Sequence, residues 1–299
     1  MGEPWRRHPA WEVVERAEAA VGQPLAHLLL DPNGKGLDQT RNAQLAVLLA
    51  SLLAWEGVKD RIPQPVAFAG HSLGQISALV ASGTLPLEDG VLLALRRADC
   101  TQAAADRRPG RMAALLGLTL EQAEQACLAE EGAAQDCWVA NDNAPGQVVV
   151  GGTPAGVESA TERARAAGAR RVLLLQVAGA FHTPLMAAAA DELAVDLAVA
   201  RFGPAEAPVV CNTDATTPAH HEWADRQAAH LVTPVRWRKS ILTMQRLGVG
   251  RYYEVGPGKV LSGLVRRILP DGPPSKSVAG PDDLPDPLPV VGTSSGRMV

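Results

Sequence analysis

The sequence predicts an α/β fold in which a smaller βαββαβ unit is inserted into a larger α/β domain. Three observations carry this prediction. A short apolar strand at 66–69 leads through a glycine-flanked turn into an apolar helix. Strand and helix patterns between 112 and 177 then follow the order βαββαβ, which is the ferredoxin-like order. Strands and helices alternate again after 184, and 299 residues are enough for one large domain with an insertion.

The first sixty residues are predicted to be mainly helical. Apolar side chains such as Trp11 and Val14 fall near one face of a helix, and residues 43–55 are apolar nearly all round, as in a core helix. We expect this helix to end before Gly57. Its apolar stretch is far shorter than the roughly 20 residues that cross a bilayer, so no membrane association is expected.

The remaining elements of the large domain follow from the same patterns. The helix after the turn should stop near Gly83, and a second amphipathic helix should cover about 87–105, with a break at 107–110. The later elements are expected as a helix at 184–198, a strand at 209–211, a helix at 235–247, a strand at 252–255 and a helix after 256–258. Proline, glycine, serine and aspartate dominate from 270 onward and predict a mostly disordered tail.

The inserted unit has clear start signals. Thr119 and Gln122 form a capping box for a helix to about 129, and Thr153-Pro154 starts another helix with proline at its first position. Strands are expected at 112–116, 138–140, 148–150 and 172–177, with a turn over 141–146. The predicted division is a catalytic domain of 1–107 and 178–275, a subdomain of 108–177, and a disordered tail of 276–299.

Composition excludes several classes of protein. The net charge of −4 and the pI near 6.0 argue against general binding to nucleic acid or to an anionic membrane. The four cysteines contain no Cys-x-x-Cys pair and are expected to be buried free thiols in a reducing cytoplasm. The basic N-terminus leads into no apolar segment of the kind found in secretory signals.

Ser72 is the candidate nucleophile. It stands in Gly70-His71-Ser72-Leu73-Gly74 between a strand and a helix, the setting of the nucleophile elbow of α/β-hydrolases. The two glycines are expected to let neighbouring backbone approach closely around a strained turn. The N-terminus of the following helix would direct N–H groups at negative charge developing on the substrate.

A serine nucleophile needs a base, and His182 is the candidate. It follows a predicted strand and precedes Thr183-Pro184, a helix start, so it stands at the mouth of the sheet. From its position alone, His182 could equally be a hydrogen-bonded core histidine. His8, His27 and the pair at 220–221 are expected to be solvated or capping residues, and no metal site is predicted.

Several ordered motifs together amount to a family resemblance. The chain resembles the malonyl-CoA:acyl carrier protein transacylases over roughly residues 5–277. The motifs are the elbow at 70–74, Arg97, Asn-Asp-Asn-Ala-Pro-Gly-Gln at 141–147, Gly-Ala-Phe-His-Thr-Pro-Leu-Met at 179–186, Pro-Val-Arg-Trp at 234–237, and Tyr-Glu-Val-Gly-Pro-Gly-Lys-Val-Leu at 253–261. This implies an α/β-hydrolase-like large domain with a ferredoxin-like subdomain, and no cofactor.

The resemblance also implies a two-step mechanism. Ser72 would attack the malonyl thioester while His182 takes its proton, and the acyl carrier protein thiol would then attack the malonyl-enzyme. The histidine of this family is oriented by a backbone carbonyl. Arg97 would bind the free malonyl carboxylate through two parallel hydrogen bonds. The resemblance assigns further site positions to Leu73, Gln44, Asn143, Phe181 and His230.

Phe181 matches the malonyl-type pattern, because relatives that take methyl-branched units carry a smaller residue there. Gln44 and Asn143 could instead be cap or turn residues. The implied partners are malonyl-CoA and an acidic acyl carrier protein, in fatty-acid or polyketide synthesis, for a cytoplasmic and monomeric enzyme. Basic candidates for contact with the carrier protein are Arg107, Arg108, Arg111, Arg170, Arg171, Arg236, Arg238 and Lys239; each could equally be part of a solvated face.

The chain departs from the family in three places. The family opens with a strand leading into a Gly-Gln-Gly loop that supplies half of the oxyanion hole, and nothing here matches it. Without this strand, its neighbours in the sheet should have an open edge. His230 stands where glutamine is usual, which is tolerable if only its carbonyl acts. Gln75 replaces a more usual glutamate, with little expected effect on the chemistry.

Three functions therefore remain open from the sequence. The chain could be a malonyl transferase whose start is truncated or misassigned, a weakly active or non-catalytic relative, or a serine hydrolase that releases the free acid. Arg97 favours transfer of malonyl over a generic esterase, because an esterase has no need of a group that binds a carboxylate.

Overall fold

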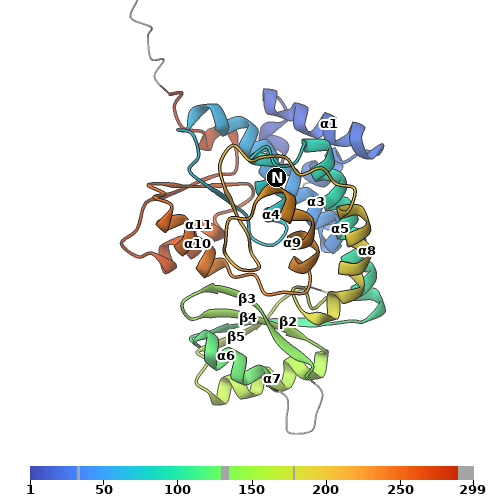
Figure 1. Ribbon diagram of the computed structural model, residues 1–299, viewed down its shortest axis with the longest axis vertical. Coiled ribbons are helices and arrows are strands. Elements are labelled where there is room, and N and C mark those ends of the chain that lie inside the picture. The colour runs from blue at the N-terminus through green and yellow to red at the C-terminus, as the bar shows by residue number, and fades with distance from the viewer. Residues whose placement is uncertain (32–33, 129–134, 178, 289–299) are drawn as a thin grey trace, which may run out of the picture.

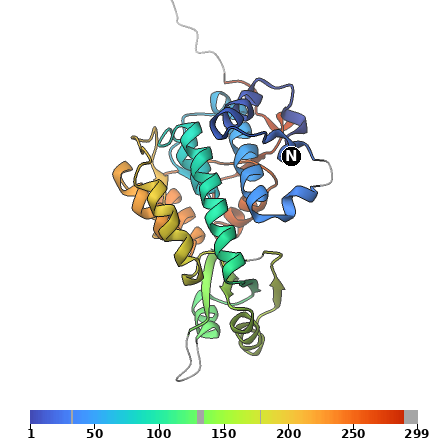
Figure 2. The same ribbon diagram turned by 90° about the vertical axis from the view of Figure 1, so that its right-hand side faces the viewer.

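A computed structural model describes residues 1–31, 34–128, 135–177 and 179–288. A four-stranded sheet with two helices on one face forms the lower part of the molecule in Figure 1. The remaining helices and two short two-stranded sheets form the larger upper part. Figure 2 shows α5 (Leu87–Arg107) running down the larger part to the four-stranded sheet, with α8 (Ala187–Leu197) packed beside it. The fold is mixed α/β, as predicted.

The four-stranded sheet comes from the predicted βαββαβ segment. Its strands are β2 (Arg111–Leu116), β3 (Cys137–Ala144), β4 (Gln147–Gly152) and β5 (Arg171–Leu174), in the order β3-β4-β2-β5 with every neighbouring pair antiparallel. The two helices are α6 (Leu120–Cys127) and α7 (Pro154–Ala166). The Thr119–Gln122 capping box is present, and the Thr153 side chain accepts the Gly156 N–H at the start of α7. Residue 129, to which the first helix was expected to run, lies outside the described residues.

Alternation along β2 explains how this sheet is packed. Ala113 and Leu115 point into a core with α6 and α7, where Val150 joins them. Met112 and Ala114 point to the other face, toward Phe181 of the larger part. Because side chains of successive strand residues point to opposite faces, one strand contributes to both cores.

The larger part is built around α3 (Thr40–Val58), most of which is buried. The nucleophile turn lies between β1 (Phe68–Ala69) and α4 (Gly74–Ala81). β1 pairs in parallel with β6 (Val209–Val210), and β7 (Tyr252–Val255) pairs in parallel with β8 (Ser275–Val278). The other helices are α1 (Glu12–Val21), α2 (Ala26–Leu30), α9 (Trp223–His230), α10 (Trp237–Arg246) and α11 (Val260–Ile268). None of the helices described here is long and apolar enough to cross a membrane.

Two predicted helix ends in the larger part are wrong. α3 continues through Gly57 to Val58. A Cβ at Gly57 would come within 2.6 Å of the Trp5 ring, so the glycine makes room for a packed indole and does not end the helix. α5 likewise includes Arg107, so the chain breaks one residue later than expected.

Two loop predictions are also wrong. The turn expected at 141–146 is confined to Pro145 and Gly146, because β3 continues to Ala144 with two irregularities in its pairing with β4. Buried partners stabilise this polar stretch as a strand. The tail expected to be disordered includes β8, whose Val278 is fully buried, and the Trp5 indole N–H donates to the Ala279 carbonyl at 3.0 Å. Pairing with β7 therefore orders this segment in spite of its polar composition. Residues 289–299 of the predicted tail lie outside the described residues.

Candidate active site

The backbone at Ser72 has a conformation that non-glycine residues rarely adopt. Its φ is +54°, between the end of β1 and the start of α4. A Cβ at Gly70 would lie 1.8 Å from the Gly74 carbonyl oxygen, so only glycine fits there. At Gly74 a Cβ would meet nothing within 4 Å, so the expectation that both glycines relieve crowding holds for the first alone. The Leu73 amide lies at the start of α4, where N–H groups have no partner within the helix.

His182 lies directly against Ser72. The two atoms Ser72 Oγ and His182 Nε2 are 2.7 Å apart, and His182 Nδ1 lies 2.8 Å from the carbonyl oxygen of His230. Because a carbonyl can only accept, Nδ1 carries the proton and Nε2 of the neutral ring accepts the Ser72 hydroxyl. His182 has a φ of +61°, so both members of the pair sit on unusual backbone. Burial, and next the nearby Arg97 charge, lower the pKa of His182 to about 3.

His230 therefore contacts the site through its main chain. Its carbonyl orients His182, and no carboxylate does so in the part of the chain that the structure describes. The His230 ring packs on the His182 ring with centroids 4.8 Å apart. Burial lowers the pKa of His230 well below its ordinary value. A residue that acts through its main-chain carbonyl can have any side chain, so its role cannot be recognised from the residue type.

Arg97 is a buried cation within reach of the nucleophile. It projects from α5, is 4% exposed, and its Nη2 donates to Ser72 Oγ at 3.2 Å. Its other guanidinium nitrogen donates to Gln44 Oε1, and Gln44 Nε2 donates to Thr101 Oγ1 at 3.3 Å. No ion pair of Arg97 occurs within the described ranges. Burial lowers the pKa of Arg97 to about 10, so it remains charged at neutral pH.

These groups line one cavity of about 1100 Å³. The predicted site residues among its walls are Ser72, His182, Arg97, Leu73, Gln44 and Phe181. Asn143 and His230 are not on its walls. Asn143 lies behind the cavity, where its Oδ1 accepts from His71 Nε2 at 2.7 Å. His71 and Asn141 also line the cavity, and neither is expected there from the sequence.

A residue that the sequence argument missed holds the elbow from behind. Asn212 follows β6, and because β6 runs parallel to β1, the ends of these strands lie side by side. Asn212 Oδ1 accepts from the Ser72 N–H at 2.9 Å, and its Nδ2 donates to the Gly70 carbonyl at 2.9 Å. The Asn212 N–H donates to Gln75 Oε1 at 2.6 Å. Position after a strand in a parallel sheet is the signal that could have found Asn212.

Two sheet edges also border the cavity. The Phe68 N–H donates to the carbonyl of Pro208, just before β6, and the Tyr252 N–H to that of Pro274, just before β8. The backbone of Ala69 and Tyr253 therefore faces the opposite edges. Ala69 and Tyr253 line the cavity. Among the strands described, β1 pairs with β6 alone and β7 with β8 alone. β1 and β7 thus have the open edges expected of strands that neighbour the family's opening strand.

The basic residues considered for contact with a carrier protein divide into two groups. Arg107 pairs with Glu192 at 2.6 Å and Arg238 with Asp142 at 3.0 Å. The others are exposed on the surface, namely Arg108, Arg111, Arg170, Arg171, Arg236 and Lys239.

Comparison with known proteins gives the family. The acyl transferase domain family matches residues 7–279. The malonyl CoA-acyl carrier protein transacylase of Bacillus subtilis (strain 168) is 37% identical over 262 residues, which are 87% of this chain and 82% of that protein. The protein of the same name from Escherichia coli (strain K12) is 40% identical over 263 residues, covering 86% of this chain and 84% of that protein.

Solved structures agree with the sequence comparisons. The crystal structure of MCAT from Streptococcus pneumoniae has a TM-score of 0.86 and 36% identity, covering 93% of this chain and 91% of that one. A malonyl-transacylase solved in complex with a type II PKS acyl-carrier protein (PlMCAT:AntF) has a TM-score of 0.85 and 33% identity, covering 92% and 89%. The chain belongs to the acyl transferase domain family, among its malonyl CoA-acyl carrier protein transacylases.

Proposed function

We propose that this chain transfers a malonyl group from malonyl-CoA to the phosphopantetheine thiol of an acyl carrier protein through a malonyl ester on Ser72. The observation that carries the proposal is the position of Ser72 Oγ, which lies 2.7 Å from His182 Nε2 and 3.2 Å from Arg97 Nη2. One oxygen thus has a base on one side and, on the other, a buried cation with no ion-pair partner among the described residues.

Ser72 would attack the thioester carbonyl of malonyl-CoA. His182 Nε2 takes the hydroxyl proton as the C–O bond forms, and gives it to the departing CoA sulfur as the C–S bond breaks. In the second half, His182 takes the proton of the phosphopantetheine thiol as its sulfur attacks the malonyl ester, and returns this proton to Ser72 Oγ as the C–O bond breaks and Ser72 is released. The Leu73 amide at the start of α4 would donate to the developing oxyanion.

Arg97 would select an acyl group with a free carboxylate. A buried cation without an ion-pair partner is costly, and a malonyl carboxylate can accept two parallel hydrogen bonds from its guanidinium. Gln44 would hold Arg97 in this orientation. The bound carboxylate would also raise the pKa of His182, because the Arg97 charge is the second cause that lowers it. Malonyl binding would thereby make His182 a stronger base.

Phe181 would limit the space beside the malonyl methylene group, since it lines the cavity next to His182. Phe181→Ala would then admit methylmalonyl-CoA. Asn143 would act indirectly, by holding His71 on the wall of the cavity. The His230 carbonyl would keep His182 in the required tautomer.

For the architecture, we propose the predicted division, an α/β-hydrolase-like large domain of 1–107 and 178–275 with a ferredoxin-like subdomain of 108–177, and we extend the large domain through β8 to Val278. The strand order β3-β4-β2-β5 supports the second assignment. The four cysteines are buried and free, which supports a cytoplasmic location. The monomeric state stays a prediction.

Labelled malonyl-CoA tests the proposed function. Label should appear on Ser72 and move to a holo carrier protein, while acetyl-CoA should label Ser72 much less. A second sample carrying the family's Gly-Gln-Gly segment ahead of Met1 would supply the other oxyanion donor, which is worth about 10²–10³ in rate. Release of free malonate faster than transfer would favour a hydrolase. No label on Ser72 in either sample would refute the transferase.

A further inference from the structure

We propose that Asn212 is a positioning residue that holds the Ser72 backbone in its left-handed conformation and thereby sets the direction of Ser72 Oγ toward its base. The proposal concerns the nucleophile of the function proposed above and rests on that function for its biological meaning. Asn212 is fully buried and is not on the wall of the cavity. It therefore acts on the reaction through Ser72 and not through contact with the substrate.

The hydrogen bonds of Asn212 hold both sides of the turn. Its side chain accepts a hydrogen bond from the Ser72 N–H and donates one to the Gly70 carbonyl, each at 2.9 Å. Its own N–H donates to Gln75 Oε1 in the first turn of α4, and its carbonyl accepts the Arg236 N–H at 2.8 Å. One residue thus links the strand end, the nucleophile and the helix start. Backbone strain persists only where surrounding contacts enforce it, and these contacts surround Ser72.

An amide is required at position 212 because one end must accept and the other must donate. An ionised aspartate would accept from the Ser72 N–H but place a second negative oxygen against the Gly70 carbonyl. A protonated aspartic acid could do both, with its O–H donating to Gly70 O. The identity of the side chain therefore predicts a pH signature that a space-filling role would not give.

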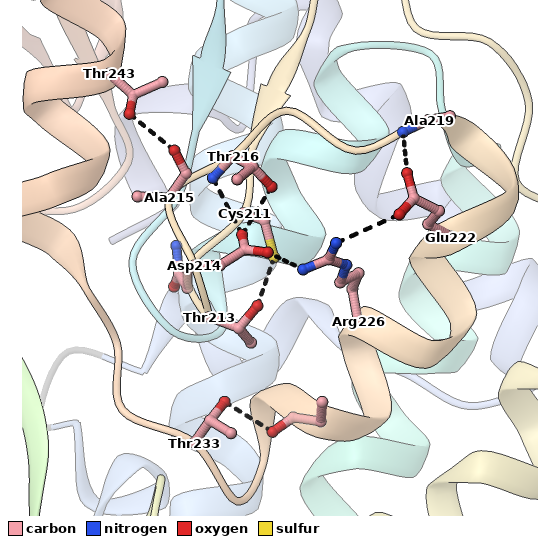
Figure 3. A network of polar contacts seen from close by, with 12 residues as sticks. Cys211, Thr213, Asp214, Ala215, Thr216, Ala219, Glu222, Arg226, Thr233 and Thr243 are labelled. Carbon is pink, nitrogen blue, oxygen red and sulfur yellow. Dashed lines mark hydrogen bonds and ion pairs between the residues drawn. The ribbon is translucent and has the colours of Figure 1, made fainter.

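The loop that carries Asn212 is itself fixed, as Figure 3 shows. Arg226 of α9 pairs with Asp214, and Thr243 of α10 donates to the Ala215 carbonyl at 2.8 Å. Thr216 Oγ1 donates to Asp214 Oδ1 at 2.9 Å within the loop. Two helices thus hold the loop in place, so that Asn212 can resist relaxation of Ser72.

The same contacts decide which amide is open to substrate. Because the Ser72 N–H donates its hydrogen bond to Asn212 Oδ1, this amide cannot donate to an acyl oxygen. The next amide, that of Leu73 at the start of α4, is left for that role. Loss of Asn212 would therefore disturb both the nucleophile and the donor beside it.

The test compares Asn212→Ala and Asn212→Asp with the parent chain and with Thr161→Val. Thr161 is a buried residue of α7 that is not on the cavity wall, and Val removes its side-chain hydrogen bonds with the Glu158 carbonyl and Arg165 with little change of shape. The probe is a fluorophosphonate, which reports the reactivity of Ser72 without requiring malonyl recognition. Thermal unfolding of every variant establishes that it is folded.

We expect Asn212→Ala to lower the labelling rate of Ser72 by about 10–100-fold, as expected for a misplaced reacting atom. Its kcat with malonyl-CoA should fall by a similar factor with little change in KM. Thr161→Val should label as the parent does. Asn212→Asp should be slow at pH 8 and recover toward the parent rate as the pH falls to 5, whereas Asn212→Ala should show no recovery.

Parent-like labelling at pH 8 by a folded Asn212→Ala or Asn212→Asp variant would overturn the proposal. So would an Asn212→Asp rate that follows the parent's pH profile. If Asn212→Ala does not fold, the pH profile of Asn212→Asp decides. If the parent chain reacts with fluorophosphonate but not with malonyl-CoA, the proposed substrate is wrong, and the role of Asn212 is still tested by the labelling rates.

Discussion

Residues 108–177 and the rest of the chain differ in how closely they follow the rules of local structure. In the described part of 108–177, no non-glycine residue has a positive φ and no buried side-chain N or O atom lacks a hydrogen-bond partner. Elsewhere, Ser72, His182 and Ala215 have positive φ. Among the described residues outside 108–177, seven buried polar side-chain atoms have no hydrogen-bond partner, in Gln75, Ser77, Gln227, His230, Trp237, Tyr252 and Ser275.

The difference indicates which region contains features that lower the free energy of unfolding. Two of the three residues with strained backbone, Ser72 and His182, form the nucleophile–base pair, and a rigid frame must hold them there. The described part of the four-stranded sheet and its capped helices contains neither strained non-glycine backbone nor unpaired buried side-chain atoms. Mutations should therefore separate the two regions: at the site, activity and stability should move in opposite directions, and in the sheet, stability should change alone.

Ser72 offers the largest effect. Ser72→Gly should abolish the acyl-enzyme and lower transfer by at least about 10⁴-fold. The same change should raise the free energy of unfolding by about 1 kcal/mol, because glycine adopts a φ of +54° without strain. Labelling with malonyl-CoA and urea unfolding measure the two effects. Ser72→Ala is the control, since it removes the hydroxyl but keeps the strain. Equal stabilities of the two variants would contradict the role given to strain.

Arg97 should come next. Arg97→Met should lower kcat/KM for malonyl-CoA by about 10³-fold, since a charge-assisted bidentate pair is lost, and should improve acetyl relative to malonyl. It should also stabilise the free enzyme, because Arg97 is a buried cation without an ion-pair partner in the described ranges. Steady-state kinetics with both thioesters provide the measurement. An unchanged malonyl-to-acetyl ratio would remove Arg97 from carboxylate recognition.

Leu115 tests the other region. It is fully buried between the sheet and its helices, so Leu115→Ala should lower the free energy of unfolding by about 2–5 kcal/mol. Activity per folded molecule should stay as in the parent, because the cavity walls do not include Leu115. Urea unfolding and active-site titration measure both. A loss of turnover in the folded fraction would mean that the sheet core and the nucleophile are coupled.

How much of this could be predicted from sequence also differs between the regions. Thr119–Gln122 and Thr153-Pro154 located both helix starts of the inserted unit, because caps are local signals. Glycine spacing located Ser72, since a close backbone approach at Gly70 leaves no alternative residue. Local patterns were sufficient at these positions.

The missed features depend on contacts between distant segments. β8 is polar in sequence and becomes a strand by pairing with β7. Asn141–Ala144 reads as a turn but is held in β3 by burial and by the bridge between Asn141 and Val235. Asn212 acts through its place beside β1. Tertiary context overrides local preference at each of these positions.

Low pH should destabilise the region that contains the buried histidines more than it destabilises residues 108–177. Burial lowers the pKa of His71, His182 and His230, and residues 108–177 contain no histidine. Below the unfolded-state pKa of 6.5 the unfolded chain binds more protons, so stability is complete above pH 6.5 and is lost as the pH falls. The loss should be about 1.4 kcal/mol per pH unit for each histidine.

Hydrogen exchange between pH 7 and 4 provides the measurement. Protection should fall first in α4 and in the segment around His182, and last in β2 and β4. Simultaneous loss in both regions would show that the two parts unfold as one unit, and that the histidines act on the whole fold.

Gln75 should give the smallest effect and the most local one. Its Oε1 accepts the Asn212 N–H, but its Nε2 is buried without a partner. Gln75→Glu keeps the acceptor, removes the unpaired donor, and places a negative charge in the first turn of α4, where the helix dipole favours it. Desolvation of the fully buried carboxylate offsets part of this effect, so we expect a gain of only about 0.5 kcal/mol in the free energy of unfolding at pH 7. Gln75→Met also removes the donor but loses the acceptor, and should be destabilising. If thermal unfolding shows Gln75→Met to be more stable than Gln75→Glu, the hydrogen bond from the Asn212 N–H to residue 75 contributes less than burial of an apolar side chain. The elbow would then be held chiefly by the side-chain amide of Asn212.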